Sequence, residues 1–493
     1  MQKLSRTLPR IQLIIAEPDC RFWLGALIRA LEAAGYSVGM EIERQSVLRS
    51  SALEHAAGLE AKLYRLAGNL WDSMTPEQRL PPLPPGESPS RIALSVTSAT
   101  ADLSIHLDSE QGVAALGTRL INGHVPLVEI IDSEGRIRAS GLPAIEEPQI
   151  FGRALETMAR RIATFMIMAL DGQSRENVGP QDMREPPAGL SAPHFLARTF
   201  ARKLIDRAAG GMTRKDHWRV GIRPTREPFQ WSGDRNLDGF IWLPDDGERY
   251  YADPVLWHEH DADFLFLEEF PYATGRGLIA YTELDELGRA KFTPRPIIER
   301  QTHLSYPFLF QHEGAIYMAP ENAAENHLPL YRAVSFPDRW EECAPLVAGI
   351  GLHDATLLAH EGAWWLLANE AREGGSSWDC LCLYTAPTPL GPFKPHPANP
   401  VLVDARLARS AGPIIPVGHK LVRPVQNCLG GYGRSLRFTE IETLSETGFR
   451  QREAGRILPR AGSRIGGVHS YGRNARFEVI DALTTRRWAP KPG

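Results

Sequence analysis

Asp253 and Asp354 occupy equivalent places in two copies of a repeated hairpin pattern, and Glu321 ends the second strand of another copy. Such carboxyl groups, once brought together, suit glycosyl chemistry, because an oxocarbenium-like transition state needs one group to protonate the leaving oxygen and another to activate the nucleophile. We therefore predict Asp253 as base, Glu321 as acid and Asp354 as the residue that orients them or tunes their charge. The alternative is that an Asp at the start of a strand caps backbone amides in a turn.

Other residues near these carboxylates have side chains suited to holding a sugar or a phosphate. Aromatic faces stack on sugar rings, and arginines bind phosphate or carboxylate groups with paired hydrogen bonds. The predicted substrate-binding residues are Glu269, Arg276, Tyr306, Trp378, Arg423, Gln426, Tyr432 and His469. Glu268 remains an alternative to Glu269. The aromatic residues could instead belong to the core of the blades, and the arginines could instead lie on the solvated surface. The histidines form no His-Glu-x-x-His motif, so neither a metal nor a cofactor is expected.

A sequence repeat with a period of about 50 residues positions these side chains. Its four clear copies begin at Ala252, Ser305, His353 and Arg409, and each has a strand, a tight turn and a second strand ending in a polar residue. A weaker fifth copy lies near Gly467, and the strand 239–243 is a candidate to complete a blade. Inner strands of a propeller converge on one channel, so the repeat predicts an all-β, five-bladed β-propeller over residues 215–490.

The N-terminal part alternates strand and helix patterns. Short apolar strands and runs with helical spacing predict an incomplete, Rossmann-like α/β domain over residues 1–175. The turn after the first strand, 17–21, is Glu-Pro-Asp-Cys-Arg, which lacks the glycine loop of a dinucleotide site. Residues 176–214 are predicted to be a linker with a connecting helix. The predicted helices span 20–35, 52–71, 149–170 and 193–207, and the predicted strands span 11–16, 91–96, 101–107 and 125–131.

Composition excludes several classes of protein. A chain of 493 residues with 43% apolar and 23% charged residues is typical of a folded protein with two or more domains. The net charge of −4 gives no electrostatic basis for binding nucleic acid. No apolar run reaches membrane-spanning length, and an odd count of five cysteines favours reduced thiols. We therefore expect a cytoplasmic protein without a transmembrane segment.

Several stretches of the repeat together resemble the bacterial proteins that are similar to plant glucosamine inositolphosphorylceramide transferase. This resemblance implies a five-bladed propeller related to arabinanase and xylosidase hydrolases, with Asp253, Glu321 and Asp354 near the catalytic carboxylates. Ser410 and Asn427 depart from the family pattern, which has Pro and Asp there. The resembling stretches are Tyr251-Ala-Asp-Pro-Val-Leu, Phe266-Leu-Glu-Glu-Phe, His303-Leu-Ser-Tyr-Pro-Phe, Met318-Ala-Pro-Glu, His353-Asp-Ala-Thr-Leu, Arg423-Pro-Val-Gln-Asn-Cys and Gly467-Val-His-Ser-Tyr.

Bacterial members of that family often carry a formyltransferase-like domain, and residues 11–170 resemble a shortened form of it. The Asn, His and Asp of formyl transfer are not recognisable, because no His-x-Ser-Leu-Leu-Pro segment is present. A degenerate domain of this kind would be structural or vestigial.

The sequence thus favours a glycosyltransferase-like enzyme of surface polysaccharide or glycolipid biosynthesis. Its partners would be a sugar or nucleotide-sugar substrate and a glycan or glycolipid acceptor. Two alternatives remain open. One is a glycoside hydrolase of the arabinanase or xylosidase type, which needs the carboxylates but no phosphate site. The other is a non-catalytic glycan-binding module, which the departures at Ser410 and Asn427 favour.

Overall fold

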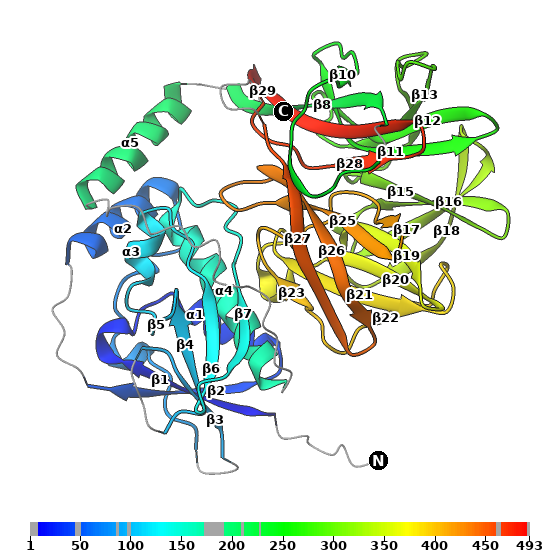
Figure 1. Ribbon diagram of the computed structural model, residues 1–493. Helices are drawn as coiled ribbons and strands as arrows, with labels where there is room; N and C mark the ends of the chain where they lie inside the picture. The colour runs from blue at the N-terminus through cyan, green and yellow to red at the C-terminus, as the bar shows by residue number, and fades with distance from the viewer. Residues whose placement is uncertain are drawn as a thin grey trace. The chain divides into compact units, whose positions relative to one another are not determined.

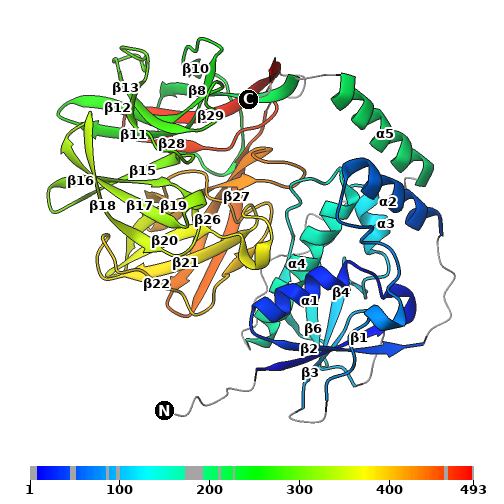
Figure 2. The same ribbon diagram turned by 180° about the vertical axis from the view of Figure 1, so that it is seen from behind.

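The chain folds into two compact units, which Figures 1 and 2 show from opposite sides. The computed structural model describes residues 8–44, 51–84, 88–95, 100–171, 192–208, 212–225, 228–459 and 465–490. The first unit comprises Met1–Ala208 and Ala371–Ser376, and the second comprises Ala209–Glu370 and Ser377–Gly493. Of the predicted linker, 176–214, residues 176–191 and 209–211 lie outside the described residues.

The first unit is an α/β domain around one mixed sheet. The strand order is β2-β1-β3-β4-β6-β7, with β5 paired to β4; β1, β2, β3 and β4 pair in parallel, and β6 and β7 join antiparallel. Its strands are β1 (Arg10–Ala16), β2 (Ser37–Glu43), β3 (Ser90–Ala93), β4 (Leu103–Leu107), β5 (Glu110–Gln111), β6 (Val128–Asp132) and β7 (Ile137–Gly141). Its α-helices are α1 (Leu24–Ala33), α2 (Ser51–Tyr64), α3 (Leu116–Ile121), α4 (Phe151–Leu170) and α5 (Ala192–Ala208).

The predicted α/β class of this unit is confirmed, and the structure adds elements that the apolar pattern missed. These additional elements are β2, β5, β7 and α3. The longest helix, α4, begins where the buried Glu60 carboxylate accepts the amides of Phe151 and Gly152 at 3.0 and 3.1 Å. This carboxylate satisfies backbone donors that the first turn of a helix leaves unpaired. Among the described helices of the chain, none has the length and apolar character needed to cross a bilayer.

The second unit is a five-bladed β-propeller, as predicted. Two of its blades are regular four-stranded meanders, and the other blades recruit additional short strands or the chain ends. The blades, in chain order, are β11 (Arg249–Glu259), β12 (Ala262–Pro271), β13 (Leu278–Leu284), β14 (Arg295–Ile298); β15 (Ser305–His312), β16 (Ala315–Glu321), β17 (His327–Ser335), β18 (Arg339–Ala348); β19 (His353–His360), β20 (Ala363–Asn369), β21 (Cys380–Ala386), β22 (Lys394–Pro395), β23 (Leu402–Val403); and β24 (Ile415–Val417), β25 (Lys420–Asn427), β26 (Ser435–Ser445), β27 (Gly448–Ile457) with β9 (Gly233–Arg235).

The remaining blade, which we call the closing blade, joins the two ends of the propeller sequence. It consists of β10 (Ile241–Trp242), β8 (Met212–Pro224), β29 (Phe477–Pro490) and β28 (Tyr471–Arg473), in that order. The long β8 and β29 strands pair antiparallel, and the predicted completing strand near Gly239 is β10. Closure of this kind leaves no blade edge open at the ring seam.

The apolar core consists of five layers, each between two neighbouring blades. For example, Phe266 and Met318 belong to one layer, whereas Val220 and Leu265 belong to the layer between the closing blade and the β11–β14 blade. The other layers lie between the β15–β18 and β19–β23 blades, the β19–β23 and β24–β27 blades, and the β24–β27 and closing blades. These layers form a closed ring, so the first strands of all blades face one axis.

Three of these first strands contain a bulge at the same place. The pairing register shifts after Ala252 in β11, after Ser305 in β15 and after His353 in β19. The next residues, Asp253, Tyr306 and Asp354, have φ values of 49°, 46° and 48°. This left-handed conformation is uncommon for residues other than glycine, and a bulge leaves a backbone amide without its strand partner.

Carboxylates from neighbouring blades accept these bulge amides. The Asp253 amide donates to Asp481 at 2.9 Å, the Tyr306 amide to Asp253 at 3.1 Å, and the Asp354 amide to Glu321 at 2.9 Å. Each bond joins one blade to the next around the ring. The alternative that Asp253 caps backbone amides is therefore realised in the structure, across blades rather than within a turn.

Replacement of Asp481 by Asn tests this capping. The carboxylate is fully buried and accepts amides from Asp253, His469 and Ser470, so an amide group in its place would direct N–H toward these donors. We expect Asp481→Asn to lower the free energy of unfolding by about 3–5 kcal/mol, measured by urea denaturation. The half-exposed Asp246→Asn is the control. A loss below about 1 kcal/mol in Asp481→Asn would mean that the bulges do not need this cap.

Candidate active site

Five buried carboxylate residues gather where the first strands of the blades meet, and we call them the central cluster. Their exposed fractions are between 0 and 9%. Asp253 and Asp354 lie on the first strands β11 and β19, Asp481 lies on β29, and Glu268 and Glu321 lie on the second strands β12 and β16. The members of the central cluster are Asp253, Glu268, Glu321, Asp354 and Asp481.

His469 bridges two members of the cluster. Its Nε2 lies 3.3 Å from Asp253 Oδ1, and its Nδ1 lies 2.7 Å from Asp481 Oδ1. Burial alone lowers the pKa of His469, but the two carboxylates outweigh it and raise the pKa well above the usual value. His469 is therefore an imidazolium at neutral pH. Burial raises the pKa of Asp253, yet the hydrogen bond and charge of His469 outweigh burial and hold that pKa below its usual value.

The same three residues, Asp253, His469 and Asp481, are close enough together to hold a metal ion, since their ligand atoms lie within 4.8 Å of one another. A protonated imidazole carries hydrogen on both nitrogens and so has no lone pair for a metal. The arrangement therefore fits a shared proton better than a cation.

Arg409 neutralises the opposite side of the cluster. Its Nε lies 2.5 Å from Asp354 Oδ2, and its Nη2 lies 3.7 Å from Glu321 Oε2. Gln426 also donates to Asp354 at 2.9 Å, and His353 Nδ1 lies 2.8 Å from Glu321 Oε1. Burial raises the pKa of Glu321, but His353, Arg409 and the Asp354 amide reverse this effect and lower it. Glu321 is therefore an ionised carboxylate.

Glu268 is the member of the cluster with which no Lys or Arg pairs among the residues that the structure describes. It is 4% exposed, and its Oε1 accepts no hydrogen bond. The nearest titratable ring is His303, whose Nε2 lies 3.5 Å from that oxygen. Burial, aided by the charge of Asp253, raises the pKa of Glu268 well above its usual value. Burial therefore favours the protonated, neutral form of the Glu268 carboxyl.

The tautomer of His303 follows from its hydrogen bonds. The Gly277 amide donates to His303 Nδ1 at 2.9 Å, so the ring proton of the neutral imidazole is on Nε2 and faces Glu268. Burial lowers the pKa of His303, which favours this neutral form. Gly277 also has no space for a side chain, because a Cβ there would lie 2.6 Å from Glu268 Oε1. His303 is 43% exposed, so solvent reaches this side of the cluster.

Half-buried aromatic rings border the cluster. Trp378 and Tyr432 have ring centroids 5.4 Å apart, and Tyr432 lies 5.2 Å from the His469 ring. Tyr250 stacks on Phe270 at 4.7 Å, and Tyr250 packs with Tyr432 against one small apolar group. Large aromatic faces next to carboxyl groups provide the surface that a sugar ring requires.

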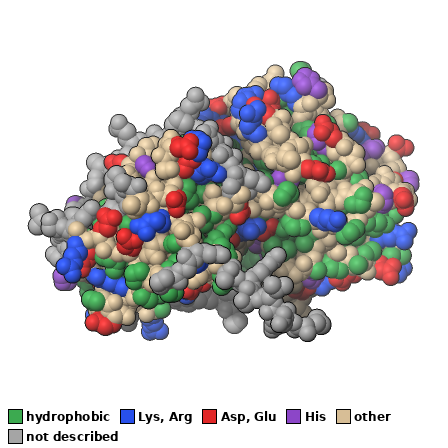
Figure 3. Space-filling view, turned by 90° about the horizontal axis from the view of Figure 1, so that it is seen from below, with side chains coloured by type: hydrophobic (Ala, Val, Ile, Leu, Met, Phe, Trp, Pro, Cys, Tyr) green, Lys and Arg blue, Asp and Glu red, His purple; other side chains and the backbone are tan. Residues whose placement is uncertain are grey.

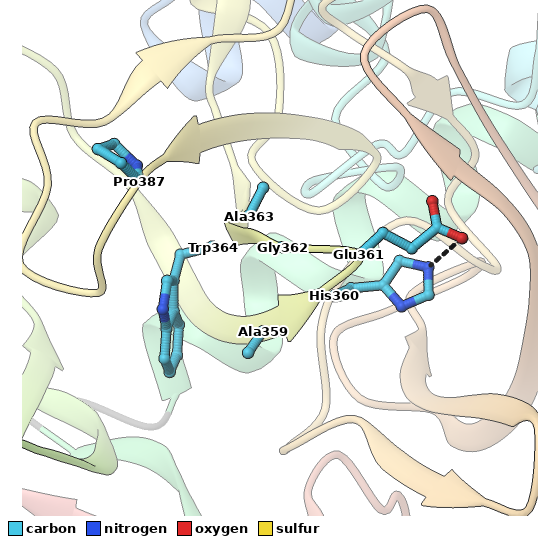
Figure 4. A pocket seen from close by; sticks show the side chains of 7 residues that line it. All are labelled: Ala359, His360, Glu361, Gly362, Ala363, Trp364 and Pro387. Atoms are coloured by element: carbon cyan, nitrogen blue, oxygen red, sulfur yellow. Dashed lines mark ion pairs between the residues drawn. The ribbon is translucent and has the colours of Figure 1, made fainter.

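A pocket elsewhere on the propeller has no part in this arrangement. It lies at the turn between β19 and β20 and is lined by His360, Glu361, Trp364 and their neighbours (Figure 4). The opposite end of β19 carries Asp354, about 20 Å away along a strand of this length.

The structure brings most of the predicted site residues together. Asp253, Glu321 and Asp354 belong to the central cluster. Gln426 contacts Asp354, and His469 contacts Asp253. The Tyr432 ring lies beneath Arg409, which pairs with Asp354. Trp378 contacts Tyr432. Tyr306 contributes its backbone amide, whereas its ring is 2% exposed in the core between two blades.

Three predicted residues lie apart from the cluster. Glu269 follows Glu268 on β12, so its side chain is on the opposite face of the strand, where it pairs with Arg249. Arg276 binds the carbonyl of Gln301. Arg423 is buried and donates to main-chain carbonyls, including that of Ala408 at 2.6 Å.

Sequence analysis did not select four residues of the site: Glu268, His303, Arg409 and Asp481. Arg409 begins the fourth copy of the repeat, at the place that His353 occupies in the third. Glu268 was the alternative to Glu269 in the sequence analysis. Strand pairing shows that Glu268 is the residue equivalent to Glu321, because Ala252 pairs with Glu268 as Ser305 pairs with Glu321.

Residues 245–478 match the family model described as "Glucosamine inositolphosphorylceramide transferase 1, N-terminal". Glucosamine inositolphosphorylceramide transferase 1 from Oryza sativa subsp. japonica is 33% identical over 205 residues, and that from Arabidopsis thaliana is 34% identical over 212 residues. Each alignment covers 41% of this chain and 27% of the relative, so the chain matches about a quarter of the length of these curated proteins.

Solved structures with remote similarity are glycoside hydrolases. An exo-β-1,3-galactanase from Clostridium thermocellum has a TM-score of 0.34 and 13% identity, with 49% of this chain and 60% of that chain covered. A β-xylosidase/α-arabinofuranosidase from a compost metagenome has a TM-score of 0.37 and 11% identity, with 49% and 91% covered. Residues 245–478 of the propeller are thus similar to the N-terminal region described for glucosamine inositolphosphorylceramide transferase 1 and to about a quarter of the length of the plant proteins of that name.

Proposed function

We propose that the propeller is a glycosyltransferase-like enzyme that transfers a sugar from an activated donor to a glycan or glycolipid acceptor. The observation that carries this proposal is the unequal pairing of the buried carboxylates: Asp253 lies next to His469 and Glu321 next to Arg409, whereas no Lys or Arg among the described residues pairs with Glu268. Carboxyl groups whose surroundings push their pKa values apart are suited to separate acid and base roles. The plant transferases matched by this region support the choice of glycosyl chemistry.

In this proposal the acid is Glu268 rather than Glu321. A general acid must hold a proton at the working pH, and Glu321, bound to His353 and near Arg409, is ionised. Asp253 keeps the role of base. Asp354 and Arg409 orient the ionised side of the cluster, and Trp378 and Tyr432 supply faces for a sugar ring.

Glycoside hydrolysis is a second candidate, which the arginine contacts favour. A nucleotide-sugar donor needs cations for its phosphates, but Arg423 is engaged with main-chain carbonyls and Arg409 with Asp354. Hydrolysis needs the acid and base carboxyls but no phosphate site.

For the first unit we propose a non-catalytic role, in a cytoplasmic protein. The first strand runs into the short 3-10 helix Glu17–Asp19, with a proline in its first turn, and no glycine-rich loop follows the strand. The backbone there does not form a phosphate cradle.

Incubation with nucleotide sugars plus membrane glycolipid, in parallel with aryl glycosides, separates these functions. We expect acceptor-dependent release of nucleoside diphosphate, measured by a coupled assay. Release of aryl alcohol alone would instead establish the hydrolase. Sugar binding without turnover of either substrate, measured by saturation-transfer NMR, would contradict both enzyme proposals.

Glu268→Gln tests the proposed acid. Gln keeps the shape of the side chain but has no carboxyl proton, so kcat should fall by about 10²–10⁴-fold. In the wild type, activity should fall as pH rises through the raised pKa of Glu268, and should fall on the acid side only below the usual Asp value of about 3.9, because the pKa of Asp253 is lowered. The variant should lose the alkaline limb of the rate profile.

The exposed Glu313→Gln, in the turn between β15 and β16, is the control and should keep both limbs. An unchanged alkaline limb in Glu268→Gln would rule out Glu268 as the acid.

Trp378→Ala tests the aromatic border. Loss of a stacking face should weaken binding of the sugar substrate by about tenfold, as measured by calorimetry. Trp364→Ala is the control. It also removes a tryptophan side chain, but on β20 next to the turn that follows β19, in the pocket of Figure 4, and it should leave the affinity for sugar unchanged. Equal losses in the two variants would indicate a general effect on the fold.

A further inference from the structure

Helix α5 (Ala192–Ala208) presents an apolar stripe to solvent. Phe200, Leu204 and Ile205 are 48, 68 and 59% exposed. Together with Ala197 and Ala201, which are also exposed, they follow the i, i+3, i+4, i+7, i+8 spacing of one helix face. In most helices a stripe of this spacing faces the core, whereas here it lies on the side of α5 that faces away from the α/β unit.

The opposite face of the helix attaches it to the first unit. Phe195 and Thr199 are buried, at 1 and 3% exposure, and the Phe195 ring contacts Phe151 at the start of α4. Lys203 lies 4.8 Å above the Tyr64 ring of α2. Helix α5 lies beside α2 in both views (Figures 1 and 2). The exposed stripe is therefore additional to the face that holds the helix in place.

Basic side chains border the exposed stripe. At 100° per residue, Arg198 and Arg202 lie along one edge of the stripe, and both arginines are exposed. The sequence of α5 has four basic residues and one acidic residue, in a chain whose net charge is −4. On the surface seen in Figure 3, by contrast, Lys and Arg alternate with Asp and Glu.

We propose that α5 is an interfacial helix that lies on a membrane containing anionic lipid, with Phe200, Leu204 and Ile205 inserted among the headgroups. An apolar face bordered by cations matches the two components of such a surface, acyl chains and negative headgroups. A second copy of the helix is a poorer partner, because its own basic edge would repel that of the first. The proposal does not depend on the chemistry of the propeller.

Flotation of the full-length protein with vesicles tests this proposal. We expect the protein to float with vesicles of phosphatidylcholine and phosphatidylserine, to float less with phosphatidylcholine alone, and to dissociate as salt is added. The double variant Leu204→Ser/Ile205→Ser should bind at least about tenfold more weakly. Arg198→Gln/Arg202→Gln should lose about fivefold or more, with the loss confined to anionic vesicles.

The control is Leu287→Ser/Val334→Ser, which removes two equally exposed apolar side chains, 55 and 57%, from the propeller. It should bind vesicles like the wild type. Circular dichroism of each variant should show an unchanged melting temperature, since the altered side chains are exposed. Absence of wild-type binding, or equal binding by the stripe variant, would overturn the proposal. Light scattering that shows a wild-type dimer and a monomeric stripe variant would overturn it in favour of a second copy.

Discussion

The hydrogen bond from a bulge amide of one blade to a carboxylate of its neighbour is the interaction on which the propeller centre depends. A bulge turns a first strand at the axis but leaves an amide that must find an acceptor in a buried place. Asp481, Asp253 and Glu321 provide these acceptors, each for the following blade. The acids at the axis are therefore required by the backbone itself, whatever reaction the site performs.

This requirement also explains why Glu268 differs from the other acids. Register makes Glu268 and Glu321 equivalent, since each pairs with the residue before a bulge. Glu321 caps the bulge of the next blade, but the amide that Glu268 would cap is taken by Asp253. Glu268 is thus left without a backbone task. Five buried carboxylates share the cations Arg409 and His469, so full ionisation of the cluster would be costly. Burial raises the pKa of both Glu268 and Asp354, and of these two only Asp354 has an arginine partner.

Much of the fold was predictable because its pattern is local. Each blade hairpin repeats a strand, a turn and a strand, so the recurrence of Asp253 and Asp354 marked the axis. The choice between Glu268 and Glu269 required the exact position of the turn before β12. The strand begins at Ala262, which pairs with Glu259. If the strand is taken to begin at Asp263, the residue equivalent to Glu321 becomes Glu269 instead of Glu268. The roles of Arg409 and Asp481 could not be predicted, because they arise from contacts with Asp354 and Asp253, which are distant in the sequence. Strand β2 was missed because its side chains are only partly buried at the edge of the sheet.

A glycolipid acceptor would impose a further condition on the enzyme. Its sugar headgroup stays at a membrane surface, so an enzyme that acts on it gains by remaining at that surface, where the effective acceptor concentration is high. A helix such as α5 provides reversible attachment through three large apolar side chains and adjacent arginines, without a span across the bilayer. A soluble glycan acceptor would make no use of such a helix. The lipid affinity of α5 and the acceptor preference of the propeller therefore both bear on whether the acceptor is a membrane glycolipid or a soluble glycan.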